Sequence, residues 1–161
     1  MPHDGHPART VDDQLAVIDG LCVLPFPAQE VRPEGGDRWG GPGYHLALLR
    51  ESRDFWEDRG EDVVEAAERE IEADLDTLSA VLTDRWGEPE AVDLWPFLGL
   101  DSPDPGFSAP EPLAYLAGVA GSMRVWRPTA VRWIALAIGQ TDPEWPIQLL
   151  AASGGASLLP R

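Results

Sequence analysis

The chain has 161 residues, of which 28 are acidic and 12 are basic, so its formal net charge is −16. This length suits a single domain with a buried core, and this charge repels the phosphates of nucleic acids and of anionic membranes. We therefore expect neither nucleic acid nor membrane among its partners, and a basic protein as the charge-complementary partner. All twelve basic residues are arginines, which excludes Schiff-base chemistry and phosphate binding by lysine.

The sequence has the features of a cytoplasmic bacterial protein. Its single cysteine, Cys22, cannot form an internal disulfide, which fits a reducing compartment. No apolar run approaches the roughly 18–20 residues that span a bilayer, and the N-terminus lacks the basic-then-apolar order of a signal peptide. Lysine and asparagine, both encoded by A-rich codons, are absent, as is typical of a GC-rich bacterial gene.

Apolar periodicity indicates one folded unit. Residues 1–9 and 154–161 lack the recurring apolar positions that tie a segment to a core. We therefore expect flexible tails on either side of a single domain at 10–153.

The first helix signal is at Thr10. Thr10 and Asp13 have the spacing of a capping box, and apolar side chains recur every three residues after them. We expect this short helix to end at Gly20, because glycine commonly follows the last helical turn. Residues 21–27 then predict a brief strand that its prolines stop.

A glycine-rich segment, GGDRWGGPGYH, follows at 35–45. It is not a phosphate loop, since a glycine and a proline stand where that motif needs lysine and a hydroxyl residue. Two interpretations stay open. The segment is a connector that lets Trp39 fold back onto the domain, or it is a lid over a small anion or ligand site formed by Arg38, Trp39 and His45.

Two successive segments then have helical patterns. The segment at about 44–59 places leucines and an aromatic residue near one face, and Gly60 is its stop signal. The segment at 61–86 has apolar residues at spacings of three and four, and Gly87 follows it. We expect an antiparallel helix pair packed on a small, mostly antiparallel sheet. The apolar stripe of 61–86 consists of Val64, Ala67, Ile71, Leu75, Leu78 and Leu82.

The second of these helices is strongly acidic. Glu65, Glu68, Glu72 and Asp76 lie on or near one side of it, and like charges four residues apart cost about 0.2–0.5 kcal/mol per pair. A solvated face explains this pattern, and so does docking against a basic surface. A dimetal site with a Glu-x-x-His motif is excluded because no histidine follows His45. We expect no metal and no cofactor.

The C-terminal half predicts the sheet. We expect a short helical turn or strand near 91–98, a surface loop near 101–112, and either a short helix or a buried strand at 113–121. Three apolar or alternating runs follow as strands, and a turn-rich QTDPE linker joins the last two into a C-terminal hairpin. The middle run is apolar on both faces, so its strand is central. The runs are MRVWRP, VRWIALAIG and WPIQLLAAS at 123–128, 131–139 and 145–153.

Tryptophan is abundant, with seven residues in the chain. Trp126 and Arg127 stand together in the first C-terminal run, where an exposed indole and a guanidinium would serve as interface anchors. The alternatives are that such tryptophans belong to the core, and that the arginines pair with the acidic helix within the molecule. The candidate partner-binding residues are Glu65, Glu68, Glu72, Asp76, Trp126 and Arg127.

No catalytic residue is predicted. Cys22 lies in an apolar run, where an inert thiol is usual, and the G-x-S-x-G motif of serine hydrolases is absent. We expect a non-enzymatic acidic interaction domain, such as an immunity- or antitoxin-like inhibitor or a chaperone of a basic protein. Two alternatives stay open: an enzyme or small-molecule-binding protein with its lid at 35–45, and a subunit of a larger bacterial assembly.

Overall fold

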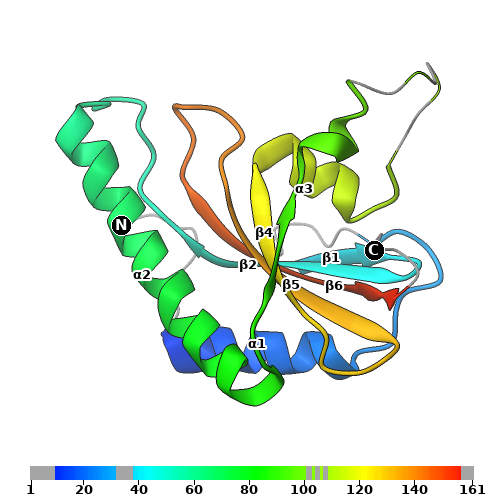
Figure 1. Cartoon of the computed structure of the whole chain (residues 1–161). Coiled ribbons are helices and arrows are strands. Elements are labelled where there is room, and N and C mark those ends of the chain that lie inside the picture. The colour runs from blue at the N-terminus through cyan, green and yellow to red at the C-terminus, as the bar shows by residue number, and fades with distance from the viewer. Residues whose placement is uncertain (1–9, 32–37, 101–102, 104–105, 107–108, 157–161) are drawn as a thin grey trace.

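The computed structural model describes residues 10–31, 38–100, 103, 106 and 109–156. Across these residues, three α-helices and one 3-10 helix pack on a six-stranded antiparallel sheet, which confirms the α+β class (Figure 1). The strand order is β1-β2-β6-β5-β4-β3. The elements are α1 (Val11–Val23), β1 (Arg38–Gly41), β2 (Tyr44–Glu51), α2 (Glu61–Trp86), β3 (Glu90–Asp93), η1 (Trp95–Leu98), α3 (Leu113–Val119), β4 (Ser122–Trp126), β5 (Arg132–Gly139) and β6 (Gln148–Gly155).

Helices cover both faces of the sheet. α1 and α2 lie on one face, whereas η1 and α3 lie on the other (Figure 1). Each face has its own core of buried apolar side chains. In β5, Trp133 belongs to the core under α3 and Ile134 belongs to the core under α1 and α2. β5 lies between β4 and β6, so the prediction of a central strand at 131–139 is confirmed.

α1 begins with the predicted capping box. The backbone N–H of Asp13 donates to Thr10 Oγ1 at 3.1 Å, and the N–H of Thr10 donates to Asp13 Oδ2 at 3.4 Å. The predicted end at Gly20 is wrong, because α1 continues to Val23 and Gly20 O accepts the N–H of Leu24. Leu21 is fully buried against the sheet. This packing extends the helix over residues that were expected to begin a strand.

The predicted helix at 44–59 is wrong, because Tyr44–Glu51 forms strand β2 between β1 and β6. Its run of consecutive apolar residues lacks a helical period, and such a run is ambiguous between a helix and a strand buried on both faces. Pairing with β6, about 100 residues away in the sequence, decides between them. The helix pair that packs on the sheet is therefore α1 with α2.

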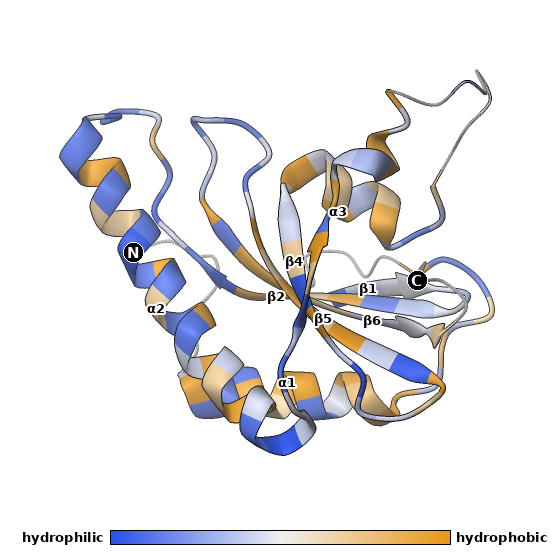
Figure 2. Ribbon diagram, in the orientation of Figure 1, coloured by the Kyte–Doolittle hydropathy of each residue, from blue (hydrophilic) through white to orange (hydrophobic). Residues whose placement is uncertain are grey.

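α2 has the predicted bounds, Glu61–Trp86, and ends at Gly87, whose φ of 93° favours glycine. Its predicted apolar stripe faces the sheet. Figure 2 shows the apolar stripe beside hydrophilic turns along the whole helix. The buried residues of α2 are Ala67, Ile71, Leu75, Leu78, Ser79 and Leu82.

The C-terminal hairpin is confirmed as β5 and β6, which pair from Arg132↔Gly155 to Gly139↔Gln148. β6 therefore includes Gly154 and Gly155, which the sequence assigned to a tail. Ala156, also in the predicted tail, donates its N–H to Val131 O at 3.0 Å. Residues 1–9 and 157–161 lie outside the described residues.

The shorter segments resolve the open alternatives. Residues 91–98 contain both predicted forms, a strand in β3 and a helical turn in η1. Residues 113–121 form helix α3 instead of a buried strand. Much of the predicted loop at 101–112 lies outside the described residues, but Ala109 is buried in the core under α3.

Gly154 gives a direct test of the packing beneath the hairpin. The indole of Trp133 lies across β6 and donates from Nε1 to Gly155 O at 3.0 Å. A Cβ at residue 154 would overlap the Trp133 ring, whereas a Cβ at residue 155 would meet no atom within 4 Å. We expect Gly154→Ala to lower the free energy of unfolding by about 1–3 kcal/mol. Gly155→Ala is the matched control and should leave it within about 0.5 kcal/mol of the wild type. Urea denaturation followed by circular dichroism measures both, and equal values for the two variants would contradict this packing.

Candidate functional site

The acidic flank of α2 is exposed. Glu65, Glu68 and Glu72 are all solvent-exposed, and their spacing of three and four residues places them side by side on the helix. Among the described residues, none of the three carboxylates makes an ion pair. We call Glu65, Glu68, Glu72 and Asp76 the acidic stripe.

Asp76, the last member of the acidic stripe, contacts the sheet. Arg124 Nη1 in β4 lies 3.4 Å from Asp76 Oδ1 and donates to Ser79 Oγ at 2.9 Å. Arg127 instead pairs with Glu90 of the neighbouring strand β3 at 3.5 Å. The predicted pairing of arginines with the acidic helix therefore occurs at Arg124, whereas Arg127 pairs within the sheet. Such partly exposed ion pairs contribute little stability.

An open cavity of about 570 Å³ lies at the C-terminal end of the acidic stripe, between the C-terminal half of α2 and β4. Asp76, Asp84, Glu88 and Arg124 are its charged lining residues. Three carboxylates against one guanidinium make this cavity suitable for a cationic side chain.

Trp126 is a core residue, so its prediction as an exposed partner-binding anchor is wrong. Its side chain is 2 % exposed, and its Nε1 donates to Thr83 Oγ1 of α2 at 3.4 Å. Strand alternation gives the reason, because Trp126 points under α2 while Arg127 follows at the end of the strand and is exposed.

The structure separates the three candidate ligand residues of the 35–45 segment. Trp39 lies on the face covered by α3 and packs edge-on against Tyr115, with ring centroids 5.4 Å apart. Arg38 and His45 lie on the α1 face, since successive side chains of a strand point to opposite faces. The structure thus fits a connector from which Trp39 folds back onto the domain. Residues 35–37 of the predicted lid lie outside the described part.

His45 fixes the chain that follows α1. It is 8 % exposed, and its Nε2–H donates to the carbonyl of Pro25 at 3.1 Å. Burial is the main cause that lowers the pKa of His45. Hydrogen bonds to Pro25 and Leu24 oppose this change, and the charges of Arg132 and Arg38 add to it. The imidazole is therefore neutral at pH 7 and serves as a structural donor.

Arg132 completes the same cluster. Its Nη1 donates to Leu21 O at 2.7 Å and to Leu24 O at 2.8 Å, which caps the C-terminal end of α1. Its guanidinium carbon lies 4.1 Å from the centre of the Phe26 ring, and that ring packs against His45. Arg132 and the neutral His45 thus both hold the chain at the C-terminal end of α1 in place.

Cys22 is not an activated nucleophile. Burial raises its pKa first, and the nearby charge of Asp19 raises it further, while Arg132 and Arg85 lower it by less. The thiol is therefore protonated at neutral pH, which matches the inert cysteine expected from the sequence.

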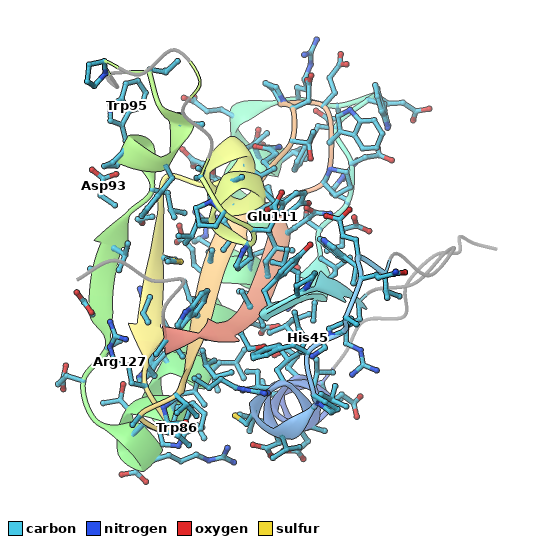
Figure 3. All side chains as sticks on the ribbon, turned by 90° about the vertical axis from the view of Figure 1, so that its right-hand side faces the viewer. His45, Trp86, Asp93, Trp95, Glu111 and Arg127 are labelled. Carbon is cyan, nitrogen blue, oxygen red and sulfur yellow. The ribbon has the colours of Figure 1, made fainter. Side chains whose placement is uncertain are left out.

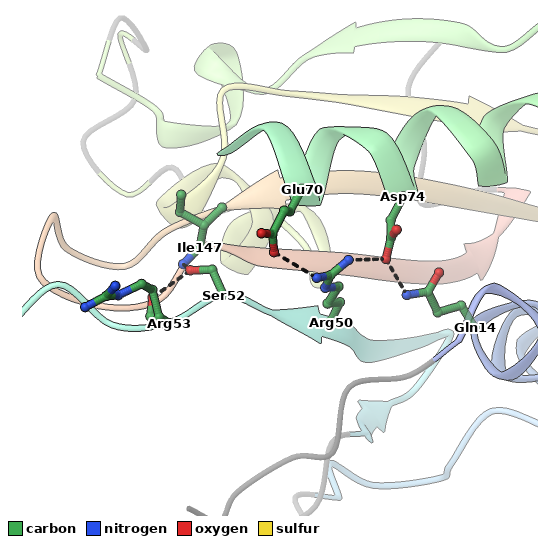
Figure 4. A network of polar contacts seen from close by, with 7 residues as sticks. All are labelled: Gln14, Arg50, Ser52, Arg53, Glu70, Asp74 and Ile147. Carbon is green, nitrogen blue, oxygen red and sulfur yellow. Dashed lines mark hydrogen bonds and ion pairs between the residues drawn. The ribbon is translucent and has the colours of Figure 1, made fainter. Parts of the chain in front are cut away.

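A polar network that the sequence did not predict holds α2 in place (Figure 4). Arg50 of β2 donates to Asp74 at 3.0 Å and to Glu70 at 3.1 Å, and Asp74 accepts a second hydrogen bond from Gln14 of α1 at 2.9 Å. A β-bulge at Leu49 shifts the register and turns Arg50 toward α2. Bulges have no simple sequence signal, so this contact was missed.

Two exposed tryptophans were also missed as a pair. Trp56 and Trp145 lie on different loops, with ring centroids 5.5 Å apart. In the sequence, Trp145 stands between Glu144 and Pro146. Its contact with Trp56 depends on the tertiary fold.

Comparisons with known proteins find no family model, no curated protein and no solved structure that matches this chain. In the part of the chain that the structure describes, no group of three or more histidine, cysteine, aspartate or glutamate side chains could hold a metal ion. None of the helices in that part has the length and apolar character needed to cross a bilayer.

The Arg50 network gives a prediction on stability. Arg50 and Asp74 are 25 % and 17 % exposed, so Arg50→Met leaves a carboxylate partly buried without its cation. We expect the free energy of unfolding to fall by about 1–3 kcal/mol. Arg85→Met breaks the more exposed Arg85–Asp19 pair and should cost less than about 1 kcal/mol. Urea denaturation of both variants tests this order, and a larger loss for Arg85→Met would contradict it.

His45 gives a prediction on pH. Its folded-state pKa lies below the unfolded value of about 6.5, so the unfolded chain binds the proton more readily. The stability that neutral His45 provides is present above pH 6.5 and is lost as pH falls through the folded-state pKa. We expect the wild type to lose more stability between pH 8 and pH 5 than His45→Gln, which cannot titrate. Denaturation at several pH values measures this difference, and parallel profiles would exclude a titrating role for His45.

Proposed function

We propose that this protein is a non-enzymatic, acidic interaction domain that binds a basic protein partner through the acidic stripe of α2. The observation that carries the proposal is the exposure of Glu65, Glu68 and Glu72 without an ion pair among the described residues. A basic surface laid against them would supply the missing counter-charges. Complementary charge speeds the encounter of two proteins and selects the partner.

The acidic stripe is destabilising to α2 in isolation. Each pair of like charges four residues apart, such as Glu68 and Glu72, costs about 0.2–0.5 kcal/mol. α2 tolerates this repulsion because its opposite flank is held by Arg50 and its apolar stripe is buried. A bound basic partner would remove the repulsion, so part of the binding free energy would come from α2 itself.

The shape of the surface also supports a protein partner. α2 has 26 residues, which makes it about 39 Å long. The cavity lined by Asp84 and Glu88 lies near one end of this helix and offers a position for a lysine or arginine side chain. A long helix flank with an acidic pocket suits a macromolecule better than a small ligand.

The sharpest form of this proposal is an immunity- or antitoxin-like inhibitor, or a chaperone, of a basic protein in the cytoplasm of a bacterium. Such a protein would neutralise its partner by covering a cationic surface. The small-molecule alternative has less support, because Trp39 and His45 lie on opposite faces of the sheet. Membership of a larger assembly would appear as a partner that salt does not release.

A charge-neutralising variant tests the proposal. We expect the tagged wild type to retain a basic protein from its native lysate at low salt and to release it as ionic strength rises. Glu65→Gln/Glu68→Gln/Glu72→Gln should weaken that complex by about tenfold or more, as expected for the loss of three ion pairs. Calorimetry with the purified partner measures the affinities.

The matched control is Asp12→Asn/Glu30→Gln/Asp93→Asn, which makes the same change in net charge at residues outside α2 that form no ion pair with it among the described residues. It should retain most of the affinity, because only the general attraction between the two proteins is reduced. If the two triple variants bind equally, the acidic stripe is not the interface.

A further inference from the structure

We propose that the exposed pair Trp56 and Trp145 is the anchor of the interface and takes an arginine side chain of the basic partner. This inference rests on the proposed function and specifies where and how the partner is held. Trp56 is 52 % exposed and Trp145 is 49 % exposed. Their rings contact each other at an interplanar angle of 64°. Tryptophan is enriched at binding hot spots, and exposed apolar side chains that contact each other mark interaction sites more often than isolated ones do.

The two tryptophans lie on loops that the fold brings together. Residues 52–60 connect β2 to α2, and residues 140–147 connect β5 to β6. The two loops lie side by side at the upper left of Figure 1. The N–H of Phe55 donates to Glu144 O at 2.9 Å, and Arg59 pairs with Glu144 at 3.4 Å.

A second set of contacts closes the base of this loop pair. Ser52 N–H donates to Ile147 O at 2.8 Å, and Ile147 N–H donates to Ser52 Oγ at 2.8 Å (Figure 4). Phe55 is fully buried in the core under α2, so its neighbour Trp56 is held at the surface. The pair is therefore preorganised, and binding would lose little conformational entropy in these loops.

The surrounding charge selects a cation as the occupant. Residues 52–62 and 140–147 contain seven acidic residues and two arginines, a balance of −5. One of these arginines, Arg59, is already paired with Glu144. Indole faces attract cations, and the planar guanidinium stacks on them better than an ammonium does. An apolar occupant would gain nothing from the seven carboxylates.

The pair lies close to the N-terminal end of α2, which carries the acidic stripe. α2 begins at Glu61, only five residues after Trp56. A cavity of about 390 Å³ lies between the loop and the Glu70 flank of the helix, and is lined by Ser52 and Arg53 from the loop and by Asp62 and Glu70 from α2. A basic partner that covers the acidic stripe and the first turn of α2 therefore also reaches the tryptophan pair. Trp95, which is 51 % exposed, lies in η1 on the other side of the sheet (Figure 3).

Two model peptides test this inference without knowledge of the natural partner. One alternates glycine with five arginines, and the other has five lysines at the same positions. At low salt we expect the wild type to bind the arginine peptide about two- to fivefold more tightly than the lysine peptide, because of stacking on the indoles. Trp56→Ala/Trp145→Ala should lose this preference, whereas the matched control Trp95→Ala should retain it.

The variants also need a readout that is independent of a general loss of structure. Circular dichroism and the Tm establish that each variant is folded. If the double alanine variant does not fold, Trp56→Leu/Trp145→Leu keeps the apolar bulk and removes the aromatic faces. It should likewise bind both peptides with equal affinity.

The outcomes separate this inference from the proposed function. Glu65→Gln/Glu68→Gln/Glu72→Gln should weaken both peptides equally and leave the arginine preference unchanged. A preference that survives the loss of both tryptophans overturns the anchor and leaves the acidic stripe in place. Unchanged peptide binding by the triple glutamine variant overturns the acidic stripe instead. Concentration-dependent dimerisation that Trp56→Ala/Trp145→Ala abolishes would identify the pair as a contact between two copies of this chain and overturn the arginine assignment.

Discussion

The contact between Arg50 and Asp74 joins the sheet to the two helices that cover one of its faces. It joins β2 to α2, and through Gln14 it reaches α1. One flank of α2 carries Glu65, Glu68 and Glu72, which make no ion pair with any residue that the structure describes, so the position of the helix depends on attraction from the other flank and on its buried apolar stripe. The bulge directs Arg50 toward α2. The resulting contact holds in place a helix whose other flank is acidic and exposed. A regular strand would direct the guanidinium to the opposite face.

The position of each tryptophan relative to the sheet determines whether it is buried or exposed. The central strands of the sheet are apolar on both faces, so both faces must be covered. Trp126 fills the core under α2, and Trp133 fills the core under α3. The exposed tryptophans lie outside the strands: Trp56 and Trp145 are on loops and Trp95 is in η1. Trp126 and Trp133 therefore serve the core from strands, whereas these three residues form part of the surface.

The features that depend on residues close together in the sequence were predicted correctly. The bounds of α2 follow from its apolar spacing and Gly87, and the start of α1 follows from the capping box at Thr10. The segment at 44–51 was predicted as a helix instead of a strand because its apolar run is compatible both with a helix and with a strand buried on both faces. Strand pairing with β6 resolves it only in three dimensions. The candidate site was predicted in part for the same reason: the acidic stripe follows from helical spacing, whereas the Trp56–Trp145 contact joins loops that are about 90 residues apart.

The cap that Arg132 places on α1 has a consequence for the order of folding. α1 has acidic residues in its first turn and no basic residue in its last turn, so it lacks its own cation at the C-terminal end. The cation comes from β5, more than 100 residues later in the chain. Contacts between residues so distant in sequence form slowly because a long loop must close first. We therefore expect α1 to reach its full length only after the β5–β6 hairpin has formed, although α1 precedes every strand of the sheet in the chain.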